Sequence, residues 1–188
     1  EMLRSLVGSE MCIRDRGKLY SRSCFRDIRY PVGKIHEDEF VTYRLLFAQK
    51  EIAVVPAPLY AYFINPKGII RSAWSPKRFH AWEAYDQQLA FFTAMGDEEL
   101  VKFRIRGYLD NALANLYTAE RADNAAELTA EIGQIEKKIR MLIPLAWKHG
   151  CIDFWPDFDF LYRFFPLKTR AYRLWLEVRA RLERKKNA

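Results

Sequence analysis

Residues with strand propensity are concentrated in one short run of this 188-residue chain. Residues 51–64 (EIAVVPAPLYAYFI) are rich in Val, Ile, Tyr and Phe, and Pro56 and Pro58 mark the join or the edge of two short strands. Two or three strands do not make a stable sheet face alone. We therefore expect a small mixed α/β piece that is the end of a larger sheet.

Helical signals dominate the rest of the chain. The run after Gly33 has apolar residues at spacings of three and four, which predicts a helix from residue 36 or 37 to about residue 50. Ser75 and Pro76 predict the start of a helix that Gly96 ends, and Asp97 predicts the cap of the next one. A third helix is expected to end at Pro144, and a last one covers residues 166–186, after an irregular aromatic stretch at 145–166.

These patterns predict an α+β fold class in four segments. Residues 1–16 have no clear helical or strand period, and residues 5–16 (SLVGSEMCIRDR) resemble translated sequencing-adapter sequence. We expect them to be non-native, with genuine protein beginning near residue 17 in a gene cut at that point; the alternative is an ordinary flexible terminus. The other segments are the mixed piece at 17–74, a helical extension at 75–144 and an aromatic, basic helical tail at 145–188.

The composition narrows the classes of partner. The net charge is +7 and the pI is about 9.3, which favours an anionic partner such as a phosphorylated ligand, a membrane surface or a nucleic acid. Three cysteines without CxxC spacing indicate a reducing compartment, and three scattered histidines suggest no metal site. No apolar run reaches the ~18 residues of a spanning helix.

The tightest cluster of acids lies in GKIHEDEF, residues 33–40. Glu37, Asp38 and Glu39 fall in the first turn of a predicted helix, where the helix dipole favours acids; Glu39 is interpreted as a solvated or capping acid. The other interpretation of the cluster is a catalytic base. The neighbouring motifs favour that interpretation for Asp38.

Five short motifs follow one another along the chain: KLY at 18–20, GK at 33–34, ED at 37–38, LYAY at 59–62 and GIIRS at 68–72. In order and spacing they resemble the C-terminal half of the catalytic domain of family 2 glycosyltransferases, the bacterial enzymes that build capsules, exopolysaccharides and lipopolysaccharide. The resemblance covers about residues 18–120. It implies a C-terminal piece of a GT-A (Rossmann-like α/β) domain followed by a mainly α-helical region.

The resemblance also implies a chemistry. Such enzymes transfer a sugar with inversion from a nucleotide-diphosphate sugar to a saccharide or lipid-linked acceptor, and they need a base for the acceptor hydroxyl. Asp38 matches the family's usual base, with Glu37 beside it as an orienting acid. His36 is predicted to contact acceptor or phosphate, and Arg71 to bind the diphosphate.

Two departures from the family pattern are visible. The Trp and Asn that often precede KLY are absent, with Arg16 and Gly17 in their places. The Asp-x-Asp motif that holds a divalent cation, Mg²⁺ or Mn²⁺, does not occur upstream of Lys18; the Asp157–Asp159 run lies far downstream and is interpreted as a coincidence. The resemblance therefore implies a metal-dependent enzyme whose metal motif this chain lacks, and we expect the chain alone to be inactive.

The tail leaves two interpretations open. Residues 167–186 place apolar side chains on one helical stripe with basic residues on the other faces, which suits either a membrane interface or packing on the chain's own domain. A cytoplasmic protein, peripheral on the inner face of the membrane, fits a lipid-linked acceptor. The alternative function is a non-catalytic basic helical module that binds membrane or nucleic acid; acids between the basic residues and the lack of a recognised motif speak against nucleic acid.

Overall fold

The computed structural model describes residues 17–55, 57, 59, 61, 73–151 and 163–164. Within these ranges the regular elements are all helical, and no strand occurs. The α-helices are α2 (Glu37–Phe47), α3 (His80–Met95), α4 (Glu98–Glu120) and α5 (Thr129–Lys148). Short 3-10 turns are η2 (Arg22–Phe25), η4 (Pro76–Phe79) and η5 (Ala125–Leu128).

The predicted α+β fold class, and with it the GT-A-like sheet piece, is wrong for the described part of the chain. Residues 51–55 form no strand, and Val54 and Val55 are 67% and 61% exposed. Strand propensity reflects packing on a half-buried pleated surface and pairing with a neighbour more than an intrinsic backbone preference. No described residue supplies that neighbour; the rest of the 51–64 run lies largely outside the described residues.

The starts of α2 and α4 and the end of α3 are set by the residues at those positions. The predicted start of α2 at Glu37 is confirmed. The Asp97 carboxylate accepts hydrogen bonds from the backbone N–H groups of Glu99 and Leu100, both at 3.1 Å, and so caps α4 as predicted. Gly96 ends α3 with φ of 72°, a left-handed conformation that glycine adopts without a Cβ clash.

The prediction that Pro144 ends a helix is wrong, because Pro144 lies inside α5, which continues to Lys148. An interior proline removes one backbone hydrogen bond and its ring clashes with the preceding turn, at a cost of about 3 kcal/mol or more. The turn after Pro144 places Ala146 in a completely buried position, and this packing stabilises the continued helix. The chain then turns at Gly150, whose φ is 63°, and the Cys151 N–H donates to the Ala146 carbonyl at 2.8 Å.

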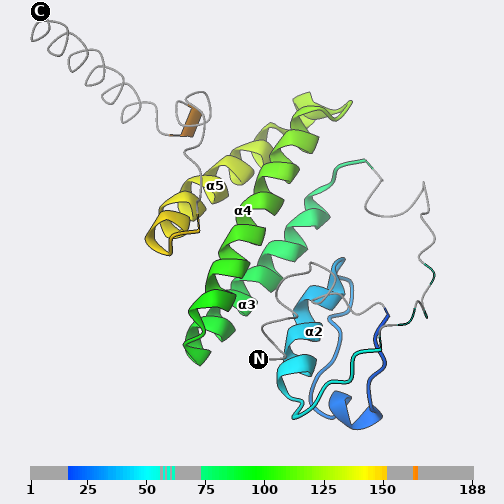
Figure 1. Ribbon diagram of the computed structural model, residues 1–188. Coiled ribbons are helices and arrows are strands. Elements are labelled where there is room, and N and C mark those ends of the chain that lie inside the picture. Colours follow the sequence, from blue (N-terminus) through cyan, green and yellow to red (C-terminus); the bar gives the residue numbers. More distant parts are fainter. Residues whose placement is uncertain are drawn as a thin grey trace, which may run out of the picture.

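Helices α3, α4 and α5 pack side by side, with α4 between the other two (Figure 1). Ile135, Ile139 and Ile143 recur every four residues on α5 and are fully buried in the main core, which Tyr108 and Ala112 of α4 also fill. The indoles of two buried tryptophans are satisfied by amides of α4: Trp74 donates to Asn115 and Trp82 to Asn111, each at 3.0 Å.

Helix α2 packs against α3 at one end of this assembly (Figure 1). Phe40, Val41 and Leu45 of α2 form a separate apolar cluster with Ala84 of α3 and with Ile28, from the segment that follows η2. The cluster fixes the first turn of α2 against the longer helices. No helix in the described ranges is both long and apolar enough to cross a membrane.

Tyr108 makes the core sensitive to alkaline pH. Burial raises the pKa of its phenol well above the ordinary value, and the nearby Asp86 carboxylate raises it further. The unfolded chain releases this proton near pH 10 while the folded chain keeps it, so this contribution to stability is complete below pH 10. Above that pH we expect the free energy of unfolding to fall by up to about 1.4 kcal/mol per pH unit.

Urea unfolding between about pH 9 and pH 11 measures this slope. Tyr108→Phe removes the titrating group and should flatten the slope relative to the unsubstituted chain. Tyr117→Phe, at an exposed tyrosine of the same helix, is the control. Equal slopes for the Tyr108→Phe variant and the unsubstituted chain would contradict the prediction.

Candidate functional site

The predicted acidic site forms the first turn of α2. Glu37, Asp38 and Glu39 follow His36, which occupies the N-cap with φ of 59° and ψ of 40°. This left-handed conformation is uncommon for residues other than glycine, although histidine is enriched in it. Such backbone outliers gather at functional sites, where surrounding contacts hold them. The structure thus brings His36, Glu37 and Asp38 together at one accessible helix end.

Asp38 and Glu37 differ in their surroundings. The Asp38 Oδ1 atom accepts a hydrogen bond from the Glu39 N–H at 3.1 Å, and its side chain is half-buried. Glu37 is exposed. Solvent therefore reaches both positions, as a base for an incoming hydroxyl requires.

The helix dipole alone also accounts for acids at this position. Carboxylates in a first turn gain about 0.3–1 kcal/mol each from the partial positive charge of the helix N-terminus. Position in the turn therefore does not separate a capping role from a catalytic one. The contacts that hold the turn carry more information.

Two long-range contacts fix the chain just before α2. Lys34 forms an ion pair with Glu83 of α3 at 2.6 Å. The Ile35 N–H donates to Nδ1 of His80, the first residue of α3, at 3.1 Å. Both contacts lie between the turn at Gly33 and the acids, so they set where the first turn of α2 begins.

A buried polar network holds the third acid. Gln88 of α3 is fully buried and donates through Nε2 to the Glu39 carbonyl at 2.6 Å and to the Glu39 carboxylate at 3.1 Å. Arg104 of α4 donates to Oε1 of Gln88 at 2.7 Å and lies 3.5 Å from the same carboxylate. Helices α2, α3 and α4 thus meet at one polar point.

The Arg104 guanidinium is enclosed on its other sides. It lies over the Tyr85 ring, 4.0 Å from the centroid, and its side chain is 6% exposed. Gly107, one turn later on α4, leaves room for it: a Cβ at Gly107 would lie 2.5 Å from Nη2 of Arg104. The Nε atom is buried and has no hydrogen-bond partner.

Glu39 is therefore not a solvated acid, since its side chain is 13% exposed and paired. Sequence reasoning missed this role, along with Gln88 and Arg104, because these partners lie 49 and 65 positions away in the sequence. The sequence signal for this network is that Gln88 and Arg104 occupy positions on the inward faces of their predicted helices, where apolar residues are usual. Arg71 lies outside the described residues.

The described residues offer no metal site. They contain no group of three or more His, Cys, Asp or Glu side chains placed to hold an ion. Asp157 and Asp159 lie outside the described ranges. Among the described residues, therefore, no ligand set fits the divalent cation that the resemblance implies.

Arg104→Met tests the network. Removing the guanidinium leaves the Glu39 carboxylate in a largely buried place without its counter-charge, so we expect a loss of about 3 kcal/mol in the free energy of unfolding. Arg44→Met, at an exposed arginine of α2, removes the same charge and should stay within about 0.5 kcal/mol of the unsubstituted chain. Chemical denaturation measures both; equal effects would contradict a structural role for the network.

A matched pair of glycines tests the close approach at Gly107. Gly133 lies inside α5 with open space around it, so Gly133→Ala should stabilise the chain by up to about 1 kcal/mol through helix propensity. Gly107→Ala offers the same propensity gain but displaces Arg104 from its partners. We expect it to be the less stable variant in thermal unfolding; equal stabilisation by both substitutions would show that Arg104 moves at no cost.

The chain is similar to a known glycosyltransferase. It is 26% identical, over an alignment 149 residues long, to the protein called glycosyltransferase GlyA of Streptococcus pneumoniae serotype 4, and the alignment takes in 73% of this chain. The chain spans about a fifth of that relative, 21% of its length. No protein-family model matches the chain, and no solved structure matches it. The similarity supports a glycosyltransferase relationship for this chain.

Proposed function

We propose that this chain carries the catalytic-base region of an inverting family 2 glycosyltransferase of bacterial cell-surface polysaccharide synthesis. Its substrates are a nucleotide-diphosphate sugar and a saccharide or lipid-linked acceptor. The observation that carries the proposal is the Glu37–Asp38 pair, accessible at the start of α2 and held there by contacts from α3 and α4. The similarity to a glycosyltransferase supports the class of reaction.

In the proposed reaction Asp38 acts as the general base. The acceptor oxygen attacks the anomeric carbon, the bond from that carbon to the diphosphate breaks, and its electron pair leaves with the nucleoside diphosphate. The proton of the acceptor hydroxyl passes to the Asp38 carboxylate. Glu37 orients the acceptor, and His36, next to it at the N-cap, contacts acceptor or phosphate. Arg71 remains a proposed ligand of the diphosphate.

The buried contacts of Glu39 suit a catalytic base at Asp38. A base works only within hydrogen-bond reach of the proton it accepts, so its position must be fixed. The Glu39 side chain points into the network with Gln88 and Arg104, which fixes the rotation of α2 about its axis. That rotation decides where Asp38, the preceding residue, is presented. Displacements of about 1 Å at such a position cost on the order of 100-fold in rate.

Several finer expectations stay predictions. One is that the 188 residues are inactive by themselves, and another is that the complete enzyme uses a divalent cation. A third is that residues 167–186, which lie outside the described residues, bind a membrane. The alternative of a non-catalytic basic module also depends on that tail. Substrate-dependent turnover separates the two functions.

Asp38→Asn tests the proposed base in the full gene product that contains these residues. With a panel of nucleotide-diphosphate sugars and saccharide or lipid-linked acceptors, we expect kcat to fall by about 100- to 10,000-fold, measured as release of nucleoside diphosphate. The KM for the acceptor should change little, because the amide keeps the size of the side chain. Asp123→Asn, at an exposed acid between α4 and α5, is the control and should leave kcat unchanged.

The outcome separates the roles of Asp38. If the full gene product turns over substrate and Asp38→Asn retains kcat within about twofold, the acid is a helix-capping residue and not the base. If no member of the panel supports release of nucleoside diphosphate, the proposed donor class is wrong.

A further inference from the structure

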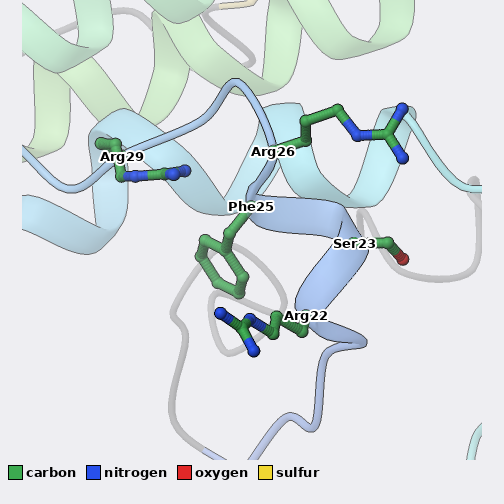
Figure 2. Close-up of a pocket in the computed structure, with 5 residues that line it drawn as sticks. All are labelled: Arg22, Ser23, Phe25, Arg26 and Arg29. Carbon is green, nitrogen blue, oxygen red and sulfur yellow. The ribbon is translucent and has the colours of Figure 1, made fainter.

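A hollow of about 510 Å³ lies beside η2, outside the acidic turn (Figure 2). Its lining residues are Arg22, Ser23, Phe25, Arg26 and Arg29. It is widely open to solvent, so it is a surface site and not an enclosed cavity. Three of the five lining residues are arginines, so the lining of the hollow is strongly positively charged.

These arginines are not engaged by acids of the described chain. Arg22, Arg26 and Arg29 are exposed, and none forms an ion pair with a described residue. Arg29 Nη1 donates to the neighbouring Ile28 carbonyl at 2.8 Å, which leaves its other donors available. By contrast, Arg104 and Arg163 each meet a carboxylate. The exposed acid of the same run, Asp27, does not line the hollow.

The wall of the hollow is built on the apolar core. The Phe25 ring packs edge-on against Tyr20, with centroids 5.7 Å apart, and lies 6.0 Å from the Tyr30 ring. All three rings pack on the cluster that contains Ile28 and Phe40. The backbone that carries the arginines is therefore fixed relative to α2, which lowers the cost of holding a ligand.

The side chains divide into two groups (Figure 2). Arg22 and Arg29 extend toward the side on which the Phe25 ring is drawn, whereas Arg26 and Ser23 extend the other way. Two guanidinium groups and an aromatic ring in the lining of one hollow suit an anion with an attached apolar or planar group. Arg26 adds positive potential from the rim.

We propose that this hollow is a binding site for a phosphate-bearing ligand, with Arg22 and Arg29 as its principal ligands. Guanidinium forks match phosphate oxygens in pairs of charge-assisted hydrogen bonds, and Phe25 contacts the group that carries the phosphate. The same chemistry fits a soluble phosphate ester or diphosphate and the headgroup of an anionic lipid. The proposal does not depend on the glycosyl transfer proposed above.

The test titrates inorganic pyrophosphate into the 188-residue chain by isothermal calorimetry at constant ionic strength. We expect saturable binding that weakens by about tenfold for each arginine removed in Arg22→Gln/Arg29→Gln. The matched control is Arg44→Gln/Arg121→Gln, which removes the same charge from two exposed arginines elsewhere and should keep the affinity within about twofold. Circular dichroism verifies that both double variants are folded.

Vesicles separate the two sources of phosphate. Co-sedimentation with phosphatidylcholine vesicles, with and without phosphatidic acid, is measured for the same variants. A lipid headgroup is identified if three results agree. The chain binds vesicles only when they contain phosphatidic acid, the binding falls in Arg22→Gln/Arg29→Gln, and pyrophosphate displaces it. Pyrophosphate binding without such vesicle binding identifies a soluble ligand.

Three results overturn the proposal: no saturable pyrophosphate binding, unchanged affinity in Arg22→Gln/Arg29→Gln, or an equal loss in the control pair. An equal loss would mean that net charge, not this hollow, attracts the anion. Asp38→Asn should bind pyrophosphate normally, so a failure of the catalytic proposal and a failure of this one give different results.

Discussion

The position of α2 depends on one buried charge. Arg104 is taken out of water between three helices, and a charge in such a place requires partners, because its lost hydration costs several kcal/mol. The close partner is the Gln88 amide at 2.7 Å, while the carboxylate of Glu39 lies at 3.5 Å. Gln88 in turn binds the backbone and the side chain of Glu39. The guanidinium therefore acts on α2 mainly through the glutamine.

Such a network specifies geometry more than it adds stability. A buried ion pair often contributes no more than apolar residues of the same volume, yet removing one member is costly. Any rotation of α2 that exposes another face to α3 breaks the contacts of Gln88 and leaves buried polar atoms unpaired. The apolar cluster of Phe40, Val41 and Ala84 permits several close packings, and the polar network selects one of them.

Sequence reasoning succeeded where the cause was local. The Asp97 cap, the glycine at 96 and the start of α2 all follow from chemistry within a few residues, and all three are confirmed. It failed where the outcome depended on distant neighbours. Residues 51–55 have strand propensity but no pairing partner among the described residues, and α5 continues past Pro144 to bury Ala146 in the next turn. The partners of Glu39 were invisible for the same reason.

The two charged features of the N-terminal part share one apolar support. The arginine hollow and the acidic turn lie on different segments, but Phe25 and Ile28 pack in the same cluster as Phe40 and Val41. Their separation is therefore set by a packed core, which resists continuous deformation. The similarity to the pneumococcal glycosyltransferase covers 73% of the chain, and any continuous stretch of that size contains α3 and α4. Helices α3 and α4 thus belong to the shared region, and the contacts of Gln88 and Arg104 with Glu39 give them the role of placing α2.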